Sequence, residues 1–243
     1  MPLSAATMDW LDWMLTTSIP LRQVDAAGNV VGRATGALIE YSGHRFLLSA
    51  EHAVPRGSSG WAIQLRFESG KGTEMYWPRD FIYVAEFRRS TSSIRELDLC
   101  VAEVAPDLQP LYEYRTPRGL FDQRPVHIFA PDLSASADAD EVFAFSGQVR
   151  AEQHGPNVFA ADMVVYPGLK LVDTQNEVLS FKLPVPHPGH DAFHGCSGAP
   201  IVDRQRRPVA LVVGGDESTH VVRGIALQRC LPALQFLCSS GDA

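Results

Sequence analysis

The sequence has few cysteines and no recognisable disulfide pattern. Its 243 residues include only four, at positions Cys100, Cys196, Cys230 and Cys238, and their spacing is not that of a disulfide framework. A chain of this length can bury a large core without such bridges. We therefore expect free thiols and a reducing, cytoplasmic environment.

Basic residues and long apolar runs are also scarce. No Lys or Arg precedes Arg22, and without a basic, apolar start no secretory signal peptide is visible. No apolar stretch reaches the length that spans a membrane. The formal net charge is −7, which argues against nucleic acid as a partner. One small basic cluster, formed by Arg204, Arg206 and Arg207, lies in a polar turn between apolar strands and predicts a solvated hairpin.

Helical periodicity is confined to the two ends of the chain. Residues 8–15 predict a short amphipathic helix that packs on the body of the protein, and residues 230–237 predict a closing helix with Pro232 in its first turn. Between them, short apolar stretches alternate with turns, which favours an all-β fold. Three prolines in residues 106–119 suggest a boundary inside one domain, 1–243, with halves 1–115 and 116–243.

A serine between two glycines lies late in the chain, in Gly195-Cys196-Ser197-Gly198-Ala199-Pro200. Glycines allow backbone angles that other residues avoid. Such a turn can point N–H groups and a hydroxyl into one small space, as attack on a carbonyl requires. A simple Gly-Ser turn in a β protein is the alternative, because short motifs arise by chance.

A nucleophilic serine needs a base, and the base needs an orienting group. His52 follows the apolar stretch 46–48, and Asp98 interrupts the apolar stretch 97–102. A buried carboxylate is costly unless it is paired, and the N–H of a neutral His52 ring would pair with it. The sequence therefore predicts a chain of contacts from Asp98 to His52 to Ser197.

With these three motifs in this order, the sequence resembles the trypsin-like (chymotrypsin-fold) serine peptidases over residues 36–228. Ser49-Ala50-Glu51-His52 stands where the family has Thr-Ala-x-His. Leu97-Asp98-Leu99 stands where it has an Asp followed by an apolar strand. The turn around Ser197 stands where it has Gly-Asp-Ser-Gly-Gly-Pro.

The resemblance implies two six-stranded antiparallel β-barrels with the active site between them. It further implies a serine endopeptidase that cleaves protein or peptide substrates through an acyl-enzyme, without a cofactor. Ser197 would be the nucleophile, His52 the base and Asp98 its orienting group. The N–H groups of Gly195 and Ser197 would form the oxyanion hole.

The chain departs from the family pattern at Cys196. Many secreted relatives pair a newly cut N-terminus with an Asp at this position, and Cys196 offers no carboxylate. We therefore expect that proteolytic maturation is unnecessary.

Substrate specificity is predicted from the residues that flank the serine. By resemblance, Asp191 would form the floor of the primary pocket and Gly215 and Gly224 its walls, which implies cleavage after Arg or Lys. The alternative is that Asp191 is a solvated loop residue. In that case His190 and His194 on the cleft loop would favour an acidic side chain.

Three other functions have sequence features in their favour or against them. The cluster His187, His190, Asp191, His194 and Cys196 is rich in ligand types, but neighbouring prolines and glycines break the helix that would bring such ligands together, so we expect no metal. An α/β-hydrolase would need its Asp and His after the serine. Asp216 and His220 do follow Ser197, but only 46 residues remain and the chain before the serine lacks strand-helix alternation. We therefore reject this fold. A non-catalytic binding module on the same fold stays open.

Overall fold

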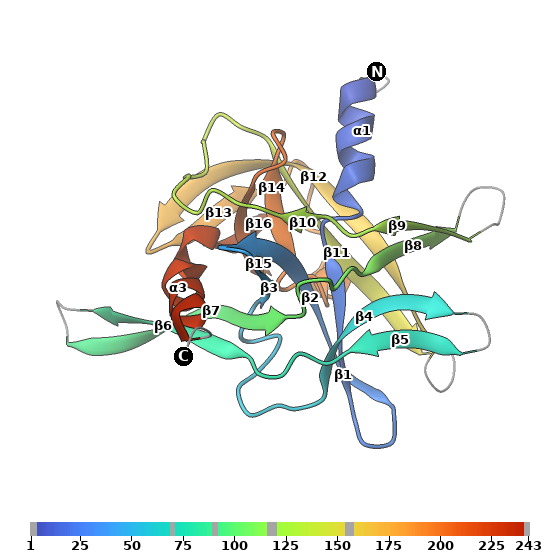
Figure 1. Ribbon diagram of the computed structural model, residues 1–243. Coiled ribbons are helices and arrows are strands. Elements are labelled where there is room, and N and C mark those ends of the chain that lie inside the picture. The colour runs from blue at the N-terminus through green and yellow to red at the C-terminus, as the bar shows by residue number, and fades with distance from the viewer. Residues whose placement is uncertain (1–3, 69–70, 89–91, 116–120, 154–157, 241–243) are drawn as a thin grey trace.

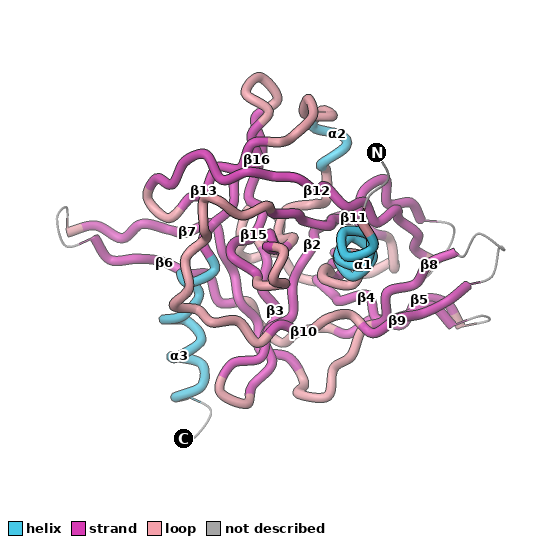
Figure 2. Tube along the Cα trace, turned by 90° about the horizontal axis from the view of Figure 1, so that it is seen from above, coloured by secondary structure: helices cyan, strands magenta, loops and turns pink. Residues whose placement is uncertain are grey.

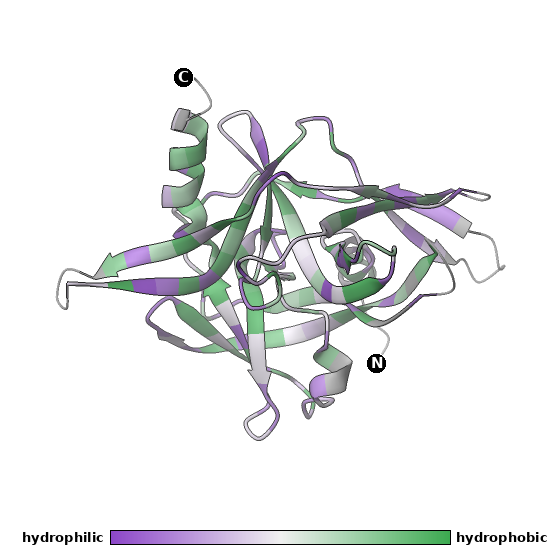
Figure 3. Ribbon diagram, turned by 90° about the horizontal axis from the view of Figure 1, so that it is seen from below, coloured by the Kyte–Doolittle hydropathy of each residue, from purple (hydrophilic) through white to green (hydrophobic). Residues whose placement is uncertain are grey.

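The computed structural model describes residues 4–68, 71–88, 92–115, 121–153 and 158–240. Two β regions lie against each other, with one helix at each end of the chain (Figure 1). Hydrophobic residues gather along the central parts of the strands, and the connecting loops are largely hydrophilic (Figure 3). The predicted all-β character with short terminal helices is therefore found.

The N-terminal region is an eight-stranded sheet in the order β5-β4-β1-β2-β3-β7-β6, with β10 pairing in parallel with β2. Its strands are β1 (Ile19–Val24), β2 (Val30–Tyr41), β3 (His44–Ser49), β4 (Trp61–Glu68), β5 (Gly72–Tyr76), β6 (Ile82–Arg88), β7 (Ser93–Val104) and β10 (Ile128–Phe129). A separate hairpin of β8 (Leu111–Arg115) and β9 (Phe121–Pro125) follows.

The predicted closure of this first region into a six-stranded barrel is not found among the described residues. The two end strands of the sheet, β5 and β6, do not pair with each other. Thr73 of β5 accepts a hydrogen bond from the Phe159 N–H of the second region at 3.4 Å. The β6–β7 hairpin projects away from the body, in both Figure 1 and Figure 2. Since neither end strand meets the other, the sheet stays open.

The C-terminal region is a closed six-stranded barrel, as the resemblance implies. The strands pair in the order β11-β12-β13-β16-β15-β14. They are β11 (Phe143–Gln153), β12 (Phe159–Gln175), β13 (Val178–Lys182), β14 (Pro200–Asp203), β15 (Pro208–Asp216) and β16 (Val221–Ala226). A short helix, α2 (His190–Phe193), precedes the serine turn.

The two terminal helices each pack on the opposite half. Helix α1 (Ala5–Met14) contacts β11 and β12, whereas α3 (Leu231–Ser240), which follows the 3₁₀ turn η1 (Leu227–Cys230), contacts β7. One hydrophobic cluster joins them, because it contains buried residues of α1, both sheets and α3. Burial of apolar surface therefore holds the halves together through both ends of the chain.

Helix α1 is anchored by contacts to the β14–β15 hairpin. The indole N–H of Trp10 donates to the Asp203 carbonyl at 3.0 Å. Arg206 pairs with Asp9 at 2.5 Å and lies 5.0 Å from the Trp13 ring centroid. The predicted packing of this helix is confirmed. The exposed arginines of the hairpin are not only solvated, since Arg206 also binds the helix.

The segment between α1 and β1 is buried against the barrel. Ser18 Oγ donates to the Ser146 carbonyl at 2.6 Å, and the hydroxyls of Thr17 and Ser146 lie 3.2 Å apart. Both Thr17 and Ser18 are buried. The chain therefore packs against β11 of the second region just before it enters β1 of the first sheet.

Candidate active site

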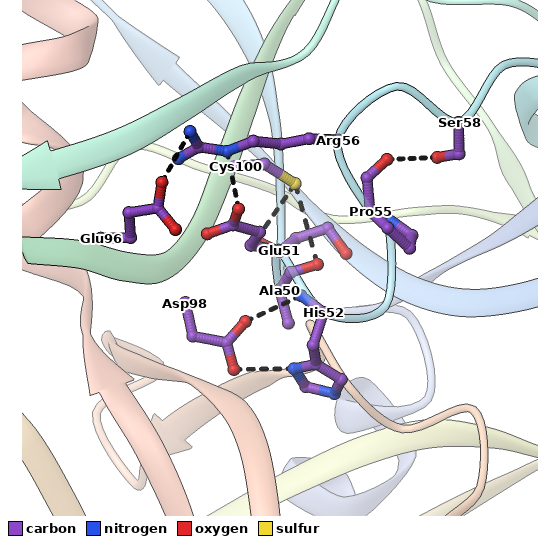
Figure 4. A network of polar contacts seen from close by, with 10 residues as sticks. Ala50, Glu51, His52, Pro55, Arg56, Ser58, Glu96, Asp98 and Cys100 are labelled. Carbon is purple, nitrogen blue, oxygen red and sulfur yellow. Dashed lines mark hydrogen bonds and ion pairs between the residues drawn. The ribbon is translucent and has the colours of Figure 1, made fainter.

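The histidine is placed by the turn that ends β3. After Ser49, the Val54 N–H bonds to the Ala50 carbonyl at 3.2 Å, which closes one turn around His52. Strand β7 lies beside β3, with Ser49 opposite Cys100, so Asp98 sits two residues further along the neighbouring strand. Figure 4 shows the two side chains pointing toward each other.

Asp98 holds both the backbone and the ring of His52. Its Oδ1 accepts the His52 backbone N–H at 2.9 Å, and its Oδ2 accepts from Nδ1 at 2.7 Å. Because a carboxylate only accepts, Nδ1 carries the ring proton. The aspartate side chain is 34% exposed. Its orientation toward His52 is therefore set by these two hydrogen bonds and not by full burial.

The opposite ring nitrogen meets the serine. His52 Nε2 lies 2.8 Å from Ser197 Oγ, and since Nδ1 holds the proton, Nε2 accepts from the hydroxyl. The hydrogen bond to Asp98 raises the pKa of His52, against the opposing effect of burial. The sequence-predicted contact from Asp98 to His52 to Ser197 is therefore present as an unbroken chain of hydrogen bonds.

A second polar network fixes the loop after His52. Arg56 Nε donates to Glu51 at 2.7 Å, and its NH1 lies 2.9 Å from Glu96. The same guanidinium lies 5.1 Å from the Tyr83 ring centroid. Glu51 directly precedes His52, and Glu96 is two residues from Asp98 on β7. Arg56 therefore links the turn that carries His52 to the strand that carries Asp98 (Figure 4).

The serine turn is held by the first sheet. Thr35 N–H donates to the Ser197 carbonyl at 2.9 Å, and Thr35 Oγ1 donates to the Gly195 carbonyl at 2.5 Å. A Cβ at Gly198 would overlap the Thr35 carbonyl and Ser49 Oγ, so only glycine permits this approach. Sequence reasoning missed Thr35, because no motif marks a strand residue that meets the turn from another region.

The residues before Ser197 form a type II turn. His194 has φ −61° and ψ 116°, and Gly195 has φ +100°. Cys196 N–H donates to the Phe193 carbonyl at 2.9 Å, which closes the turn. A type II turn needs φ > 0 at its third residue, and a Cβ on Gly195 would also lie 2.7 Å from the Gln148 carbonyl oxygen.

Two backbone N–H groups, one in this turn and one directly after it, have no acceptor among the described residues. Among the contacts of the described residues, neither the Gly195 N–H nor the Ser197 N–H donates to another group. Both lie beside the serine hydroxyl in the chain. The turn therefore leaves a pair of N–H groups available to an incoming oxygen, as an oxyanion hole requires.

Cys196 is buried beneath the turn rather than offered to solvent. Its side chain packs on Gly147 of β11, where an added Cβ would overlap the sulfur. Burial raises the pKa of the thiol to about 12, so it is not a thiolate nucleophile. None of the four cysteines, all of which lie in the described part of the chain, forms a disulfide bond, as the sequence predicted.

The structure gives the surroundings of the two glycines predicted as pocket walls. The His187 ring lies in front of Gly215, with Nε2 2.7 Å from where a Cβ would lie, and the role of Gly215 as a wall stays a prediction. The assignment of Gly224 is wrong. A Cβ there would meet Ile201 and Ala210 at 2.8 and 2.9 Å, because the register of β16 turns Gly224 into the barrel core.

The remaining predicted substrate residues lie in and after α2. Asp191 belongs to this short helix, and its side chain lies outside the part of the structure that is described. Its role as a pocket floor stays a prediction. His194 is exposed in the turn before Gly195, with its ring 6.1 Å from that of His190. Among the described residues, no group of three or more His, Cys, Asp or Glu side chains is arranged to hold a metal ion.

Strand β15 offers a free edge beside the serine. Val212 bonds through its backbone to Gly198 and Ala199, the two residues after Ser197. Beyond this point, residues 214–216 pair with β16 on one side, and none of the described strands pairs with the other side. A Cβ at Gly214 would meet no atom within 4 Å. An extended peptide can therefore add to this edge.

Comparisons with known proteins identify the fold. The sequence matches no protein-family model and no curated protein. Among solved structures, the chain is similar to a serine endoprotease from Yersinia pestis, with a TM-score of 0.59 and 11% identity over 99% of this chain and 69% of that one.

Two further similar structures differ in the activity that their names describe. An inactivated protease paralogue from the scabies mite matches with a TM-score of 0.58 and 14% identity, over 97% of this chain and 95% of that chain. Human heparin binding protein matches with a TM-score of 0.57 and 11% identity, over 92% and 91%. The chain thus has the chymotrypsin-type fold of the trypsin-like serine proteases.

No helix in the described part of the chain is both long and apolar enough to cross a membrane.

Proposed function

We propose that this protein is a serine endopeptidase that hydrolyses peptide bonds through an acyl-enzyme. The observation that carries the proposal is the hydrogen-bonded series from Asp98 through His52 to Ser197, next to a type II turn with two unused N–H groups. A binding protein on this fold has no need of this combination.

In the proposed first step, Ser197 Oγ attacks the carbonyl carbon of the substrate while its proton passes to His52 Nε2. Asp98 keeps the ring oriented and favours the imidazolium that forms. The N–H groups of Gly195 and Ser197 donate to the oxyanion. His52 then gives its proton to the leaving amine, which leaves an ester on Ser197.

In the second step, His52 takes a proton from water as the water attacks the ester carbonyl. The bond to Ser197 Oγ breaks, and the proton returns to that oxygen. No metal or cofactor is needed for either step. The substrate backbone would lie along the free edge of β15, which supports a protein or peptide in extended form.

A preference for Arg or Lys finds little support in the site. Of the three residues on which it depends, Gly224 faces the core and Gly215 faces the His187 ring. The Asp191 side chain is outside the described part. A cytoplasmic location, and the absence of nucleic acid or membrane as partners, remain predictions from the sequence.

The test is labelling by a fluorophosphonate probe, which reacts with activated serines. Wild-type protein is expected to be labelled at Ser197, and Ser197→Ala to be unlabelled with an unchanged circular dichroism spectrum. Absence of labelling in folded wild type would instead favour a non-catalytic binding module, an alternative that the similarity to an inactivated paralogue keeps relevant.

A further inference from the structure

The His187 side chain lies between two residues whose chain neighbours hold the serine turn. One is Gly215 of β15, whose Cα faces His187 Nε2. The other is Phe193, whose ring centroid lies 4.4 Å from that of His187 at an interplanar angle of 80°. Phe193 is two residues before Gly195, and Gly215 is three residues after Val212, which bonds to the residues following Ser197.

The tautomer of His187 follows from its hydrogen bonds. Nδ1 accepts the Gly189 backbone N–H at 3.1 Å, so the ring proton of the neutral form sits on Nε2. That Nε2 is buried and has no hydrogen-bond partner among the described residues. A buried donor without an acceptor is unfavourable, and the unfavourable energy is relieved when an acceptor arrives.

The backbone of His187 and the ring of Phe193 are each held by neighbouring groups. The His187 N–H donates to His220 Nδ1 at 3.1 Å. Phe193 is in turn fixed by Tyr166 and Phe145, with ring centroids 4.6 and 5.7 Å away. The His187 ring is therefore packed against ordered aromatic side chains, although most of the loop residues around it are exposed.

The titratable groups near His187 are Glu217, Asp216, His190 and His220. Burial lowers the pKa of His187, which favours the neutral ring in the free protein, while Glu217 acts in the opposite direction. Both carboxylates are bound to the local backbone. Glu217 accepts the His190 N–H at 2.5 Å, and Asp216 accepts from Ser218 N–H at 2.9 Å and Oγ at 2.6 Å.

We propose that His187 is the specificity-determining residue of the substrate side-chain pocket, and that the pocket takes an acidic side chain, Glu or Asp, on the amino side of the cleaved bond. This rests on the proposed function of the same site. A carboxylate that enters between Phe193 and Gly215 displaces the ring from Gly215 and accepts its Nε2 proton, a charge-assisted hydrogen bond. A guanidinium or ammonium would meet a donor instead of an acceptor.

The pH dependence of the preference follows from the same contact. A bound carboxylate favours the charged imidazolium of His187, whereas a carboxamide of the same shape does not. The ratio of kcat/KM for Glu over Gln therefore rises as the pH falls. Both substrates use His52 in the same way, so its ionisation cancels in this ratio.

The experiment compares matched quenched peptides with Glu, Gln, Asp, Arg or Ala at the cleaved position, from about pH 5.5 to 8.5, a range that spans the ordinary histidine pKa. We expect kcat/KM for the Glu peptide to exceed that for the Gln peptide by about 10- to 100-fold at the acidic end, with a smaller ratio at the alkaline end.

The variants test whether His187 causes this preference. His187→Phe should lose the preference but still cleave the Ala peptide. His187→Gln keeps a donor that does not titrate, so it should keep a preference that no longer varies with pH. The control is His44→Phe, which should behave as wild type. His44 is the first residue of β3 and pairs with Glu103 of β7.

A preference for Arg, or a Glu-to-Gln ratio of one in wild type, would overturn the proposal, as would an unchanged ratio in both His187 variants. If these occur while Ser197 is labelled by the fluorophosphonate, only the specificity is wrong. If no peptide is cleaved and Ser197 is not labelled, the proposed function fails as well.

Discussion

Replacing Gly195 by alanine tests how the chain builds its oxyanion hole. The substitution has two costs that come from the backbone. The φ of +100° is unfavourable for an L-residue by about 1–2 kcal/mol, and the new Cβ would lie 2.7 Å from the Gln148 carbonyl oxygen. Rotation of the peptide between residues 194 and 195 relieves both, because it converts the type II turn into a type I turn.

The converted turn would direct the N–H of residue 195 away from the serine. One of two oxyanion donors is then lost, which costs about 10²–10³ in kcat, or roughly 2.7–4 kcal/mol of transition-state stabilisation. The substrate carbonyl depends on the hole less than the oxyanion does, so KM should change little. The contacts from Asp98 to His52 to Ser197 are not touched by the substitution.

The assay is steady-state cleavage of a quenched peptide, with thermal unfolding measured in parallel. Gly43→Ala is the matched control, since Gly43 also has a positive φ, +81°, but no atom lies within 4 Å of the position that its Cβ would take. The control should lower the melting temperature and leave kcat unchanged. A folded Gly195→Ala protein with wild-type kcat would refute the reasoning.

Three further outcomes are expected. The kcat/KM of wild type should fall as pH drops below a value above 6.5, because Asp98 raises the pKa of His52 and the imidazolium cannot act as a base; Asp98→Asn should move this acidic limb to lower pH, and an unmoved limb would contradict the assignment. Thr35→Val removes the hydrogen bond to the Gly195 carbonyl and should lower kcat by about five- to tenfold, whereas Thr35→Ser should restore it in the same peptide assay. Cys196→Ala removes a buried sulfur that packs on Gly147 and should cost about 1 kcal/mol in urea unfolding with kcat close to wild type; loss of activity in the stable variant would assign the thiol a direct role.

The three catalytic candidates can be predicted from the sequence because each lies in a short local motif. His52 ends an apolar strand, Asp98 interrupts another, and Ser197 lies in a glycine turn. Their mutual distances depend on strand pairing, which the motifs imply only through the resemblance. The structure brings all three together.

The pocket is harder to predict because side-chain direction depends on register. A shift of one residue along β16 moves a side chain from one face of the sheet to the other. The sequence therefore places Gly224 in the pocket, although it faces Ile201 in the core. His187 stands out in the sequence only as part of a ligand-like cluster, and its contact with Gly215 joins a loop residue to a residue of strand β15.

Local sequence patterns also do not determine whether the first region closes into a barrel. The strands are predicted from alternation, but closure requires the two end strands to meet. Here β5 contacts Phe159 of the other region instead. Thr35 escapes prediction for a similar reason, since its partner Gly195 is far away in the chain and lies in the other half.

The order of synthesis gives the C-terminal helix a further consequence. Ser197 is made late, and α3, the last element of the described chain, packs on β7, the strand that carries Asp98. Leu234 of α3 is fully buried in the cluster that also contains Leu97 and Leu99. A growing chain on the ribosome therefore lacks this support for its aspartate strand until α3 has been synthesised. We expect a ribosome-bound chain stalled before residue 230 to stay unlabelled by the fluorophosphonate probe, because α3 is not yet present to support the strand that carries Asp98.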